Sequence, residues 1–442
     1  MIQLSEHFTY SKLIRFVIPS IIMMIFTSIY GVIDGLFVSN FVGKTPFAAI
    51  NLILPFLMLF GALGFMIGTG GSAIIAVTLG EGKEEKANQY FSLLVYCTIV
   101  IGVLLTILGL FMVRPIAITL GATGEMLENC ILYGYVLMPV LTAFMLQNVF
   151  QSFMVTAEKP RLGLGITVLA GITNILLDAL FVAVLKWGLI GAALATAISQ
   201  IIGGFLPLVY FARPNPSRLK LVKTSIYPRV LLQTCLNGSS ELMVNVSLSL
   251  VNMLYNFQLM RLAGENGIAA YGVIMYVNFI FISAFIGYSI GSGPIVGYHY
   301  GAGHTDELKN MFRKSMVFIT VTGVVLTITA ELLAYPLSHI FVGYDKALLD
   351  MTHRGFALYS IAFFFMGYSI YGSGFFTALN NGLVSALISF LRTLLFQILA
   401  VLLLPMIFGL DGVWTAIVVA EAAALFVTFF FLIKMRGKYK YA

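Results

Sequence analysis

TPFAAINLILPFLMLFGALGFMIGTGGSAIIAVTLG (Thr45 to Gly80) decides the fold class, because it contains no charged side chain. About 20 apolar residues of helix cross the ~30 Å hydrocarbon core of a bilayer. Further charge-free runs of helix length occur at Ala87–Val113, Asn129–Ala157, Trp187–Ala212 and Gly355–Leu391. The sequence therefore predicts an all-helical protein with many membrane crossings. Runs of this length exclude a membrane barrel, whose alternating strands have about 10 residues each.

The overall composition agrees with this class. Of the 442 residues, 60% are hydrophobic and only 10% are charged, whereas roughly a quarter are charged in soluble domains. The cysteines Cys97, Cys130 and Cys235 are too few and too scattered for a disulfide framework or a thiolate metal site. The opening residues MIQLSEHFTYSK are polar and lack the order of a signal peptide.

Breaking the apolar runs at charges, Pro and Gly predicts twelve transmembrane helices. We expect them at residues 11–40, 47–79, 89–113, 129–157, 162–185, 188–211, 230–260, 268–300, 315–338, 355–378, 383–405 and 412–434. An even number of crossings puts both termini on one side. Eighteen of the 25 Lys and Arg residues lie on that side, six lie in the opposite loops, and Arg392 lies within a helix. The positive-inside rule then predicts cytoplasmic termini, and the net charge of +7 needs no nucleic acid to explain it.

The two halves of the chain repeat each other. A shift by half of the 442 residues aligns many residues without a gap. Among the aligned pairs are Gly43 with Gly264, Gly80 with Gly301, Gly82 with Gly303, Pro115 with Pro336 and Gly188 with Gly409. Because each half has six helices, the repeats should be parallel. We expect an amino-terminal lobe at 1–211, a cytoplasmic linker at 212–229 and a carboxyl-terminal lobe at 230–442, facing a central cavity.

Polar residues within the predicted helices of the first lobe share one depth. Asp34, Asp178 and Thr196 each lie about eight residues from an external helix end, or roughly 12 Å below the outer face. Asn174 lies one turn from Asp178 on the same helix face. These side chains could form a pocket for a proton or a cation such as Na⁺, since a buried carboxylate requires a partner, a cavity or a proton. The alternative is a hydrogen-bonded network that only fixes helix packing.

A second polar region is predicted in the other lobe. Glu241 heads a polar helix face that continues through Ser240, Asn245, Ser249, Asn252 and Asn256. Glu421 aligns with Gln200 in the repeat, so that position is polar in both halves. Arg392 could pair with either glutamate. We therefore expect Glu241, Asn245, Arg392 and Glu421 to form a substrate site or a second polar site.

Several other chemistries are not indicated. LGEGKEEK (Leu79 to Lys86) lacks the spacing of a phosphate-binding loop, and no HExxH or clustered metal-ligand spacing occurs. Without a nucleotide-binding domain, ATP is not expected to be the direct energy source, and no cofactor is predicted. The chain also offers no nucleophile–base pair for a membrane-embedded acyltransferase and no extramembrane domain for a receptor. We expect a protein that is not an enzyme.

Four stretches resemble the multidrug and toxic compound extrusion (MATE) transporters, closest to their bacterial MepA-like and DinF-like branches. The stretches are IPSIIMMIFTSIYGVIDGLFVSNFVG (Ile18 to Gly43), LGEGKEEKA after the second helix, SFMVTAEKP (Ser152 to Pro160) and TNILLDALFV (Thr173 to Val182). The resemblance covers nearly the whole chain. It implies a V of two six-helix lobes in the bacterial cytoplasmic membrane, exporting amphipathic and often cationic compounds by antiport with H⁺ or Na⁺.

The resemblance also assigns roles to residues. The DinF-like pattern binds the coupling cation through an Asp on helix 1, an Asn and an Asp on helix 5 and a Thr on helix 6, which Asp34, Asn174, Asp178 and Thr196 match. The same pattern has a helix-1 proline at a bend, and Pro19 fits. NorM relatives use a helix-7 Glu, which Glu241 matches, together with a helix-10 Asp. Residues 355–378 contain no acid, so this chain departs from the second pattern.

The leading hypothesis is therefore a cation-coupled multidrug exporter that acts as a monomer and contributes to antibiotic resistance. The alternative is a flippase of lipids or lipid-linked saccharides with related architecture. Such flippases usually need cationic cavities for pyrophosphate, whereas the predicted helices hold one deep arginine, Arg392, and five acids: Asp34, Asp178, Glu241, Glu331 and Glu421. That balance favours cationic cargo. The residues do not distinguish H⁺ from Na⁺.

Overall fold

The computed structural model describes residues 2–442, except for the side chain of Lys44, one of the six basic residues assigned to the opposite loops. All regular structure in these residues is helical. The first half contains α1 (Tyr10–Phe37), η1 (Val38–Val42), α2 (Lys44–Gly80), α3 (Glu84–Thr119), α4 (Gly124–Leu137), η2 (Met138–Val140), α5 (Leu141–Thr156), α6 (Pro160–Asp178), η3 (Ala179–Val184) and α7 (Gly188–Ala212). The second half contains α8 (Pro228–Gly301), α9 (Thr305–Val342), α10 (Lys346–Ser360), α11 (Ala362–Ala378), α12 (Gly382–Phe390), η4 (Leu391–Leu395), α13 (Phe396–Phe408) and α14 (Leu410–Tyr439).

The number of membrane crossings agrees with the prediction once two breaks are considered. Within the described residues, 10 helical segments are long and apolar enough to cross a bilayer. One of them, α8, contains a break at Gly264, whose φ of 61° and ψ of −149° are not helical. In addition, α10 and α11 together form one crossing that bends by 44°. Separating the halves of α8 and counting the bent pair gives the twelve predicted crossings.

Several helices extend further than predicted. The helix expected at 89–113 runs over Glu84–Thr119, and the one expected at 315–338 runs over Thr305–Val342. Charged residues end the apolar part of a crossing, but they do not end the helix, because outside the bilayer the charges are hydrated. The prediction placed helix ends at charges and therefore located the bilayer crossings better than the helix ends.

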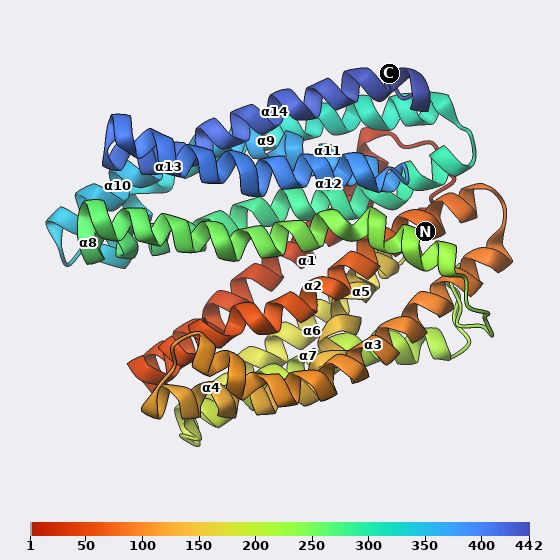
Figure 1. The fold of residues 1–442 in the computed structure, drawn as a ribbon. Coiled ribbons are helices and arrows are strands. Elements are labelled where there is room, and N and C mark those ends of the chain that lie inside the picture. Colours follow the sequence, from red (N-terminus) through yellow and green to blue (C-terminus); the bar gives the residue numbers. More distant parts are fainter. Residues whose placement is uncertain (1) are drawn as a thin grey trace.

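The helices form two bundles, α1–α7 and α8–α14, which lie close together near the end that holds both termini and spread apart toward the other end (Figure 1). The turns of the two bundles are equivalent. Gly43 and Gly264, Gly82 and Gly303, and Gly188 and Gly409 all have positive φ angles, between 58° and 124°. Glycine adopts this backbone conformation without steric cost, so each aligned pair of glycines marks the same turn in both halves.

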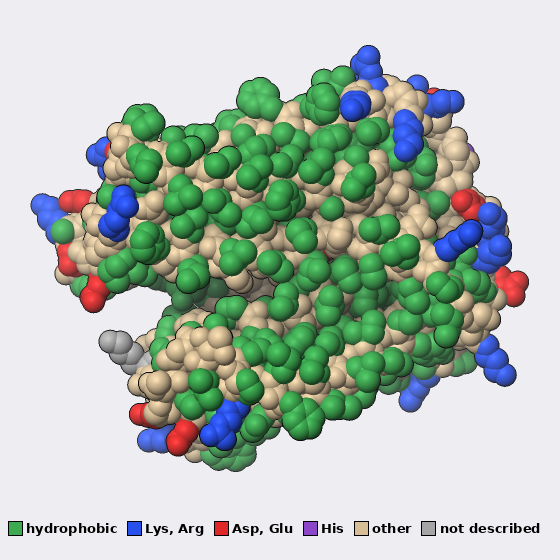
Figure 2. Space-filling view, viewed as in Figure 1, with side chains coloured by type: hydrophobic (Ala, Val, Ile, Leu, Met, Phe, Trp, Pro, Cys, Tyr) green, Lys and Arg blue, Asp and Glu red, His purple; other side chains and the backbone are tan. Residues whose placement is uncertain are grey.

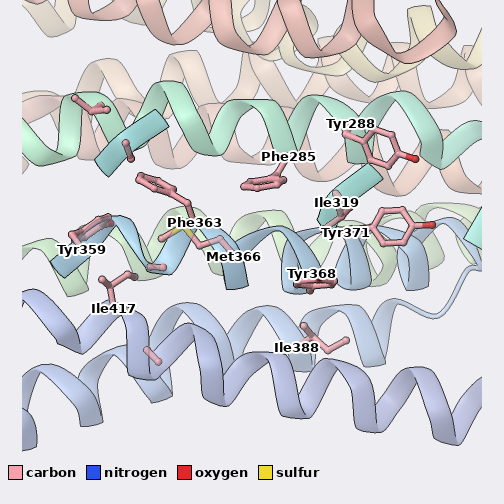
Figure 3. Close-up of a cluster of buried hydrophobic side chains, with 14 of the residues drawn as sticks. Phe285, Tyr288, Ile319, Tyr359, Phe363, Met366, Tyr368, Tyr371, Ile388 and Ile417 are labelled. Atoms are coloured by element: carbon pink, nitrogen blue, oxygen red, sulfur yellow. The ribbon is translucent and has the colours of Figure 1, made fainter. Parts of the chain in front are cut away.

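Aromatic residues fill the core of the second bundle (Figure 3). The rings of Tyr288 and Phe318 stack with their centroids 4.2 Å apart, and Tyr371 lies beside them. The Tyr288 hydroxyl donates a hydrogen bond to Ser315 Oγ at 2.8 Å. Buried aromatic side chains of this kind contribute large apolar areas and fix the packing of α8, α9 and α11.

The two bundles touch backbone to backbone near the termini. A methyl group at Gly80 would collide with the main-chain carbonyl of Tyr298, and one at Gly301 would collide with that of Val77. These two contacts are equivalent under the repeat. At the other end the bundles are separated by a hollow, which is open to the surface in Figure 2. The structure is therefore a V that is closed at the end of the termini.

The amino-terminal segment also joins the two bundles at this closed end. The amide of Leu4 donates to Glu158 of the first bundle at 2.8 Å, and the amide of Phe8 donates to Glu307 of the second bundle at 2.9 Å. The Lys314 ammonium donates to the carbonyl oxygen of Phe8. Opening this end of the molecule would break several of these bonds.

Candidate ion and substrate sites

The structure brings together the acids predicted for the first lobe. Asp34 lies near the end of α1, Asp178 is the last residue of α6, and Thr196 lies in α7. The side chain of Asp34 interacts with those of Asp178 and Thr196. Asn174 lies one turn before Asp178 on α6 and is also buried. Three helices thus converge at one polar site within an otherwise apolar bundle.

Most oxygen atoms of this site have no hydrogen-bond partner among the residues that the structure describes. The buried atoms without a partner are Asp34 Oδ1, Asn174 Oδ1, Asp178 Oδ1, Asp178 Oδ2 and Thr196 Oγ1. Leaving a buried polar group unpaired costs about 1–3 kcal/mol, and more when the group is charged. A proton or a small cation bound here would satisfy these oxygen acceptors.

The acids differ in their exposure. Asp178 is fully buried, whereas Asp34 is partly exposed. A cation that enters the site would therefore meet Asp34 first and Asp178 behind it. No cluster of three or more His, Cys, Asp and Glu side chains among the described residues is arranged as a metal site. Two carboxylates with neutral oxygen ligands would suit a weakly held monovalent cation.

The helices change geometry at or near three of the deeply placed charges. The π-helical turn η1 begins four residues after Asp34, η3 begins directly after Asp178, and η4 contains Arg392. Such turns insert one residue into a helix and are frequent at functional sites. Nothing in the residue pattern predicts them, because a π turn is a small change in hydrogen-bond register and has no distinctive composition.

Sequence reasoning missed one residue of this site. Tyr133 of α4 is buried and faces Asp34, Asp178 and Thr196. Nearby, the side chain of Tyr30 interacts with both Gln147 and Asp34. Tyrosines are common in this chain, which has 21 of them, so only the three-dimensional contact identifies Tyr133.

The second lobe holds a buried ion pair. The Nε of Arg392 donates to both carboxylate oxygens of Glu421 at 2.9 Å. Their side chains are only 8% and 2% exposed. The sequence did not determine whether Arg392 pairs with Glu241 or with Glu421. The structure shows that it pairs with Glu421. This pair is satisfied internally, in contrast to the acids of the first lobe.

A central cavity lies between the lobes and encloses about 800 Å³ of space between atoms, part of it open to solvent. Its polar lining comes from both lobes: Thr69, Ser72, Ser152, Glu241, Ser289, Ser373, Thr377, Ser389 and Arg392. Apolar side chains such as Ile286 and Ile290 complete the wall. A cavity in which apolar walls carry polar groups that can orient a ligand is typical of a small-molecule site.

The four residues predicted for the second polar site do not all reach this cavity. Glu241 and Arg392 line it, and Glu421 lies behind Arg392. Asn245 instead donates a hydrogen bond to the main-chain carbonyl of Glu241 at 2.8 Å, within its own helix. Pro19 lies buried inside α1, which remains continuous over Tyr10–Phe37. Its role as a bend is a prediction.

Comparison with known proteins identifies the class and then the family. The fold and the buried polar sites define a multi-pass membrane transporter. The MatE family model matches residues 19–180 and 242–402, so the chain belongs to the MatE family. This result confirms the resemblance found in the sequence.

The relatives agree with this assignment. The multidrug export protein MepA of Staphylococcus haemolyticus is 25% identical over 442 residues, which cover 98% of this chain and 95% of the relative. A crystal structure of MATE in complex with MaL6 has a TM-score of 0.93 at 22% identity, covering 99% of this chain and 98% of that one. An outward-facing multidrug resistance MATE family transporter also has a TM-score of 0.93 at 22% identity, with the same coverage. These two structures show that the chain has the fold of MATE transporters.

Proposed function

We propose that the protein exports amphipathic, often cationic small molecules by antiport with inward H⁺ or Na⁺. One observation carries the proposal: buried, unpartnered oxygens around Asp34 and Asp178 lie in one lobe, while a separate cavity with Glu241 lies between the lobes. An antiporter requires such a division, because the coupling ion and the cargo must each have a place to bind.

The coupling step would act through charge repulsion. Asp34 and Asp178 face each other in a low-dielectric region, where two carboxylates repel strongly. A proton or cation that binds between them relieves this repulsion and draws α1, α6 and α7 together. At a membrane potential of 100 mV each inward positive charge supplies about 2.3 kcal/mol, or roughly forty-fold in cargo concentration.

The moving parts would be the two lobes, 1–211 and 230–442. The linker at 212–229 would move with the first lobe, since the Lys220 amide binds Asn88 at 2.7 Å and the Tyr227 hydroxyl binds Gln89 at 2.8 Å. We assign both termini to the cytoplasm and the protein to the cytoplasmic membrane as a monomer. The V described above would then be open to the outside, and the contacts at Gly80 and Gly301 would separate when the protein turns inward.

The charge of the cavity favours export of cations over the flipping of pyrophosphate-linked lipids. Arg392 is the cation among the lining residues, and Glu421 already neutralises it at 2.9 Å. Glu241 remains as the acid that faces the cavity. Cationic cargo would gain an attraction to Glu241, whereas a pyrophosphate would meet no unpaired positive charge there.

Transport by purified protein in liposomes tests the proposal. Ethidium movement should follow an imposed H⁺ gradient or an imposed Na⁺ gradient and should stop when that gradient is dissipated. Glu241→Gln should narrow the range of cationic cargo while the ion dependence stays unchanged. Ethidium movement that is indifferent to both gradients would contradict antiport. Efficient flipping of a pyrophosphate-linked lipid would support the alternative.

A further inference from the structure

A second pocket lies at the closed end of the first lobe, away from both sites described above. It is lined by Ile2, Arg15, Phe16, Glu158, Lys159, Pro160, Arg161 and Leu162, and it encloses about 1050 Å³ of space, part of it open. Three of these eight side chains are basic and one is acidic. Since α1 and α6 both begin at this end, the pocket lies where their first turns meet.

The acid in this pocket already has partners. Glu158 Oε1 accepts the Leu4 amide at 2.8 Å and pairs with Arg218 at 3.2 Å. Arg15 and Arg161 are exposed and form no ion pair with any of the residues that the structure describes. Lys159 is only 8% exposed, so its positive charge is held at the inner wall of the pocket. The exposed guanidinium groups of Arg15 and Arg161 therefore give this pocket positive charge that no ion pair among the described residues neutralises.

Each arginine lies at the end of an exposed apolar stripe on its own helix. On α1, Ile18 and Ile22 follow Arg15 at spacings of three and seven residues and are 41% and 45% exposed. On α6, Leu169, Ile172 and Leu176 follow Arg161 on one face and are exposed by 49%, 46% and 64%. Residues at these spacings share a helix face.

The two helices are also in contact along their length. A methyl group at Gly163 of α6 would lie 3.9 Å from Met23 Sδ of α1, and one at Gly171 would lie 2.8 Å from the Tyr30 ring. The helices are therefore packed side by side and run in the same direction. Their exposed apolar stripes start at the same end, next to the two arginines.

We propose that this pocket binds the anionic headgroup of a membrane phospholipid, whose acyl chains lie along the exposed stripes of α1 and α6. A phosphate is recognised by guanidinium groups through paired charge-assisted hydrogen bonds. Basic pockets between transmembrane helices bind such headgroups. The apolar stripes distinguish a lipid from free phosphate, because only a lipid gains from contact with them. Ile2 in the pocket wall would place the lipid against the segment that joins the lobes.

Native mass spectrometry of the full-length protein in detergent tests the proposal. The protein is mixed with phosphatidylglycerol or with phosphatidylcholine, and the retained lipid is measured. We expect selective retention of phosphatidylglycerol and a weakening of about five-fold for Arg15→Gln or Arg161→Gln, and about thirty-fold for both together. Arg313→Gln is the matched control, since Arg313 is an exposed arginine at the same end of the molecule but in the other lobe.

Two further measurements complete the test. Inorganic phosphate should not displace the lipid, since it lacks acyl chains; displacement at matched concentration would overturn the assignment to a lipid. Arg161→Glu should abolish selectivity for the anionic lipid while the protein elutes as a folded species in size-exclusion chromatography. Equal retention of both lipids by the unaltered protein, or equal losses for Arg313→Gln and the double variant, would overturn the proposal.

Discussion

The two lobes bury their charges in opposite ways. In the second lobe, Arg392 and Glu421 neutralise each other through two hydrogen bonds of 2.9 Å. In the first lobe, Asp34 and Asp178 face each other with no basic partner among the described residues, and most of their oxygens are unpaired. Both lobes have the same repeated pattern of helices and turns. The comparison teaches that the same architecture can hold either an ion pair that is satisfied internally or two acids whose oxygens remain unpaired.

The largest effect on stability should come from removing one partner of the ion pair between Arg392 and Glu421. Glu421→Gln leaves Arg392 buried without its counter-charge, which should lower the free energy of unfolding by about 3–5 kcal/mol. Removing both charges, as Arg392→Met with Glu421→Leu, should recover most of this loss. Denaturant unfolding in detergent measures both. Asp178→Asn is the contrasting variant: it removes a repulsive charge and should cost little. If Asp178→Asn lowered the free energy of unfolding as much as Glu421→Gln does, the proposed difference between the two lobes would be wrong.

The second effect concerns the contact between the lobes. Gly80→Ala places a methyl group against the carbonyl of Tyr298 and should destabilise the closed end by about 1–3 kcal/mol. The population should shift toward conformations in which this end is open. Distances between spin labels on α2 and α8 report the shift. Gly272→Ala is the control, because no atom lies within 4 Å of the added methyl group. Identical distance distributions in both variants would show that the contact at Gly80 does not control the opening of the closed end.

The neutral oxygens of the first-lobe site should have a smaller effect. Thr196→Ala removes one ligand but no charge, so the affinity for the coupling ion should fall about tenfold while transport continues at high ion concentration. Efflux measured against ion concentration gives this affinity. Thr173→Ala is the control, since the hydroxyl of Thr173 bonds to the carbonyl of Leu169 in its own helix. An unchanged ion affinity in Thr196→Ala would remove Thr196 from the site.

The smallest effect is expected at Pro19, which has no counterpart in the second lobe because its repeat partner is Ser240. Proline removes one backbone hydrogen bond and makes bending of α1 easier. Pro19→Ala should lower the turnover of efflux while expression stays intact. Pro115→Ala, inside α3, controls for the loss of a helix proline in general. Equal turnover in Pro19→Ala and the unaltered protein would show that bending of α1 at Pro19 does not limit transport.

Much of the fold could be predicted because it follows from which side chains are stable in water and which are stable in lipid. Apolar runs such as Thr45–Gly80 have no stable place outside a bilayer, and the glycines at Gly43 and Gly264 mark equivalent turns because other residues rarely adopt their backbone angles. The helix ends were predicted less well, because the charges of Glu84 and Asp306 lie in water and the helices continue through them.

The site could be predicted only in part. Acids are so rare in membrane helices that Asp34, Asp178 and Glu241 were apparent from the sequence. The partner of Arg392, the interaction of Tyr133 with Thr196 beside the two aspartates, and the π turns depend on how the helices are rotated against one another. Residue spacing within one helix contains no information about that rotation, so these features required the structure.

The central claim is that Asp34 and Asp178 act as one coupling site, and ion-driven efflux in liposomes tests it most directly. Asp34→Asn, Asp178→Asn and the double variant are compared under the same ion gradient, with unfolding measured on the same preparations. Each single variant should lose gradient-driven efflux while remaining folded. The double variant should be no worse than either, because residues that act as a unit are not additive. Normal ion dependence in both single variants would contradict the account and would place the coupling elsewhere.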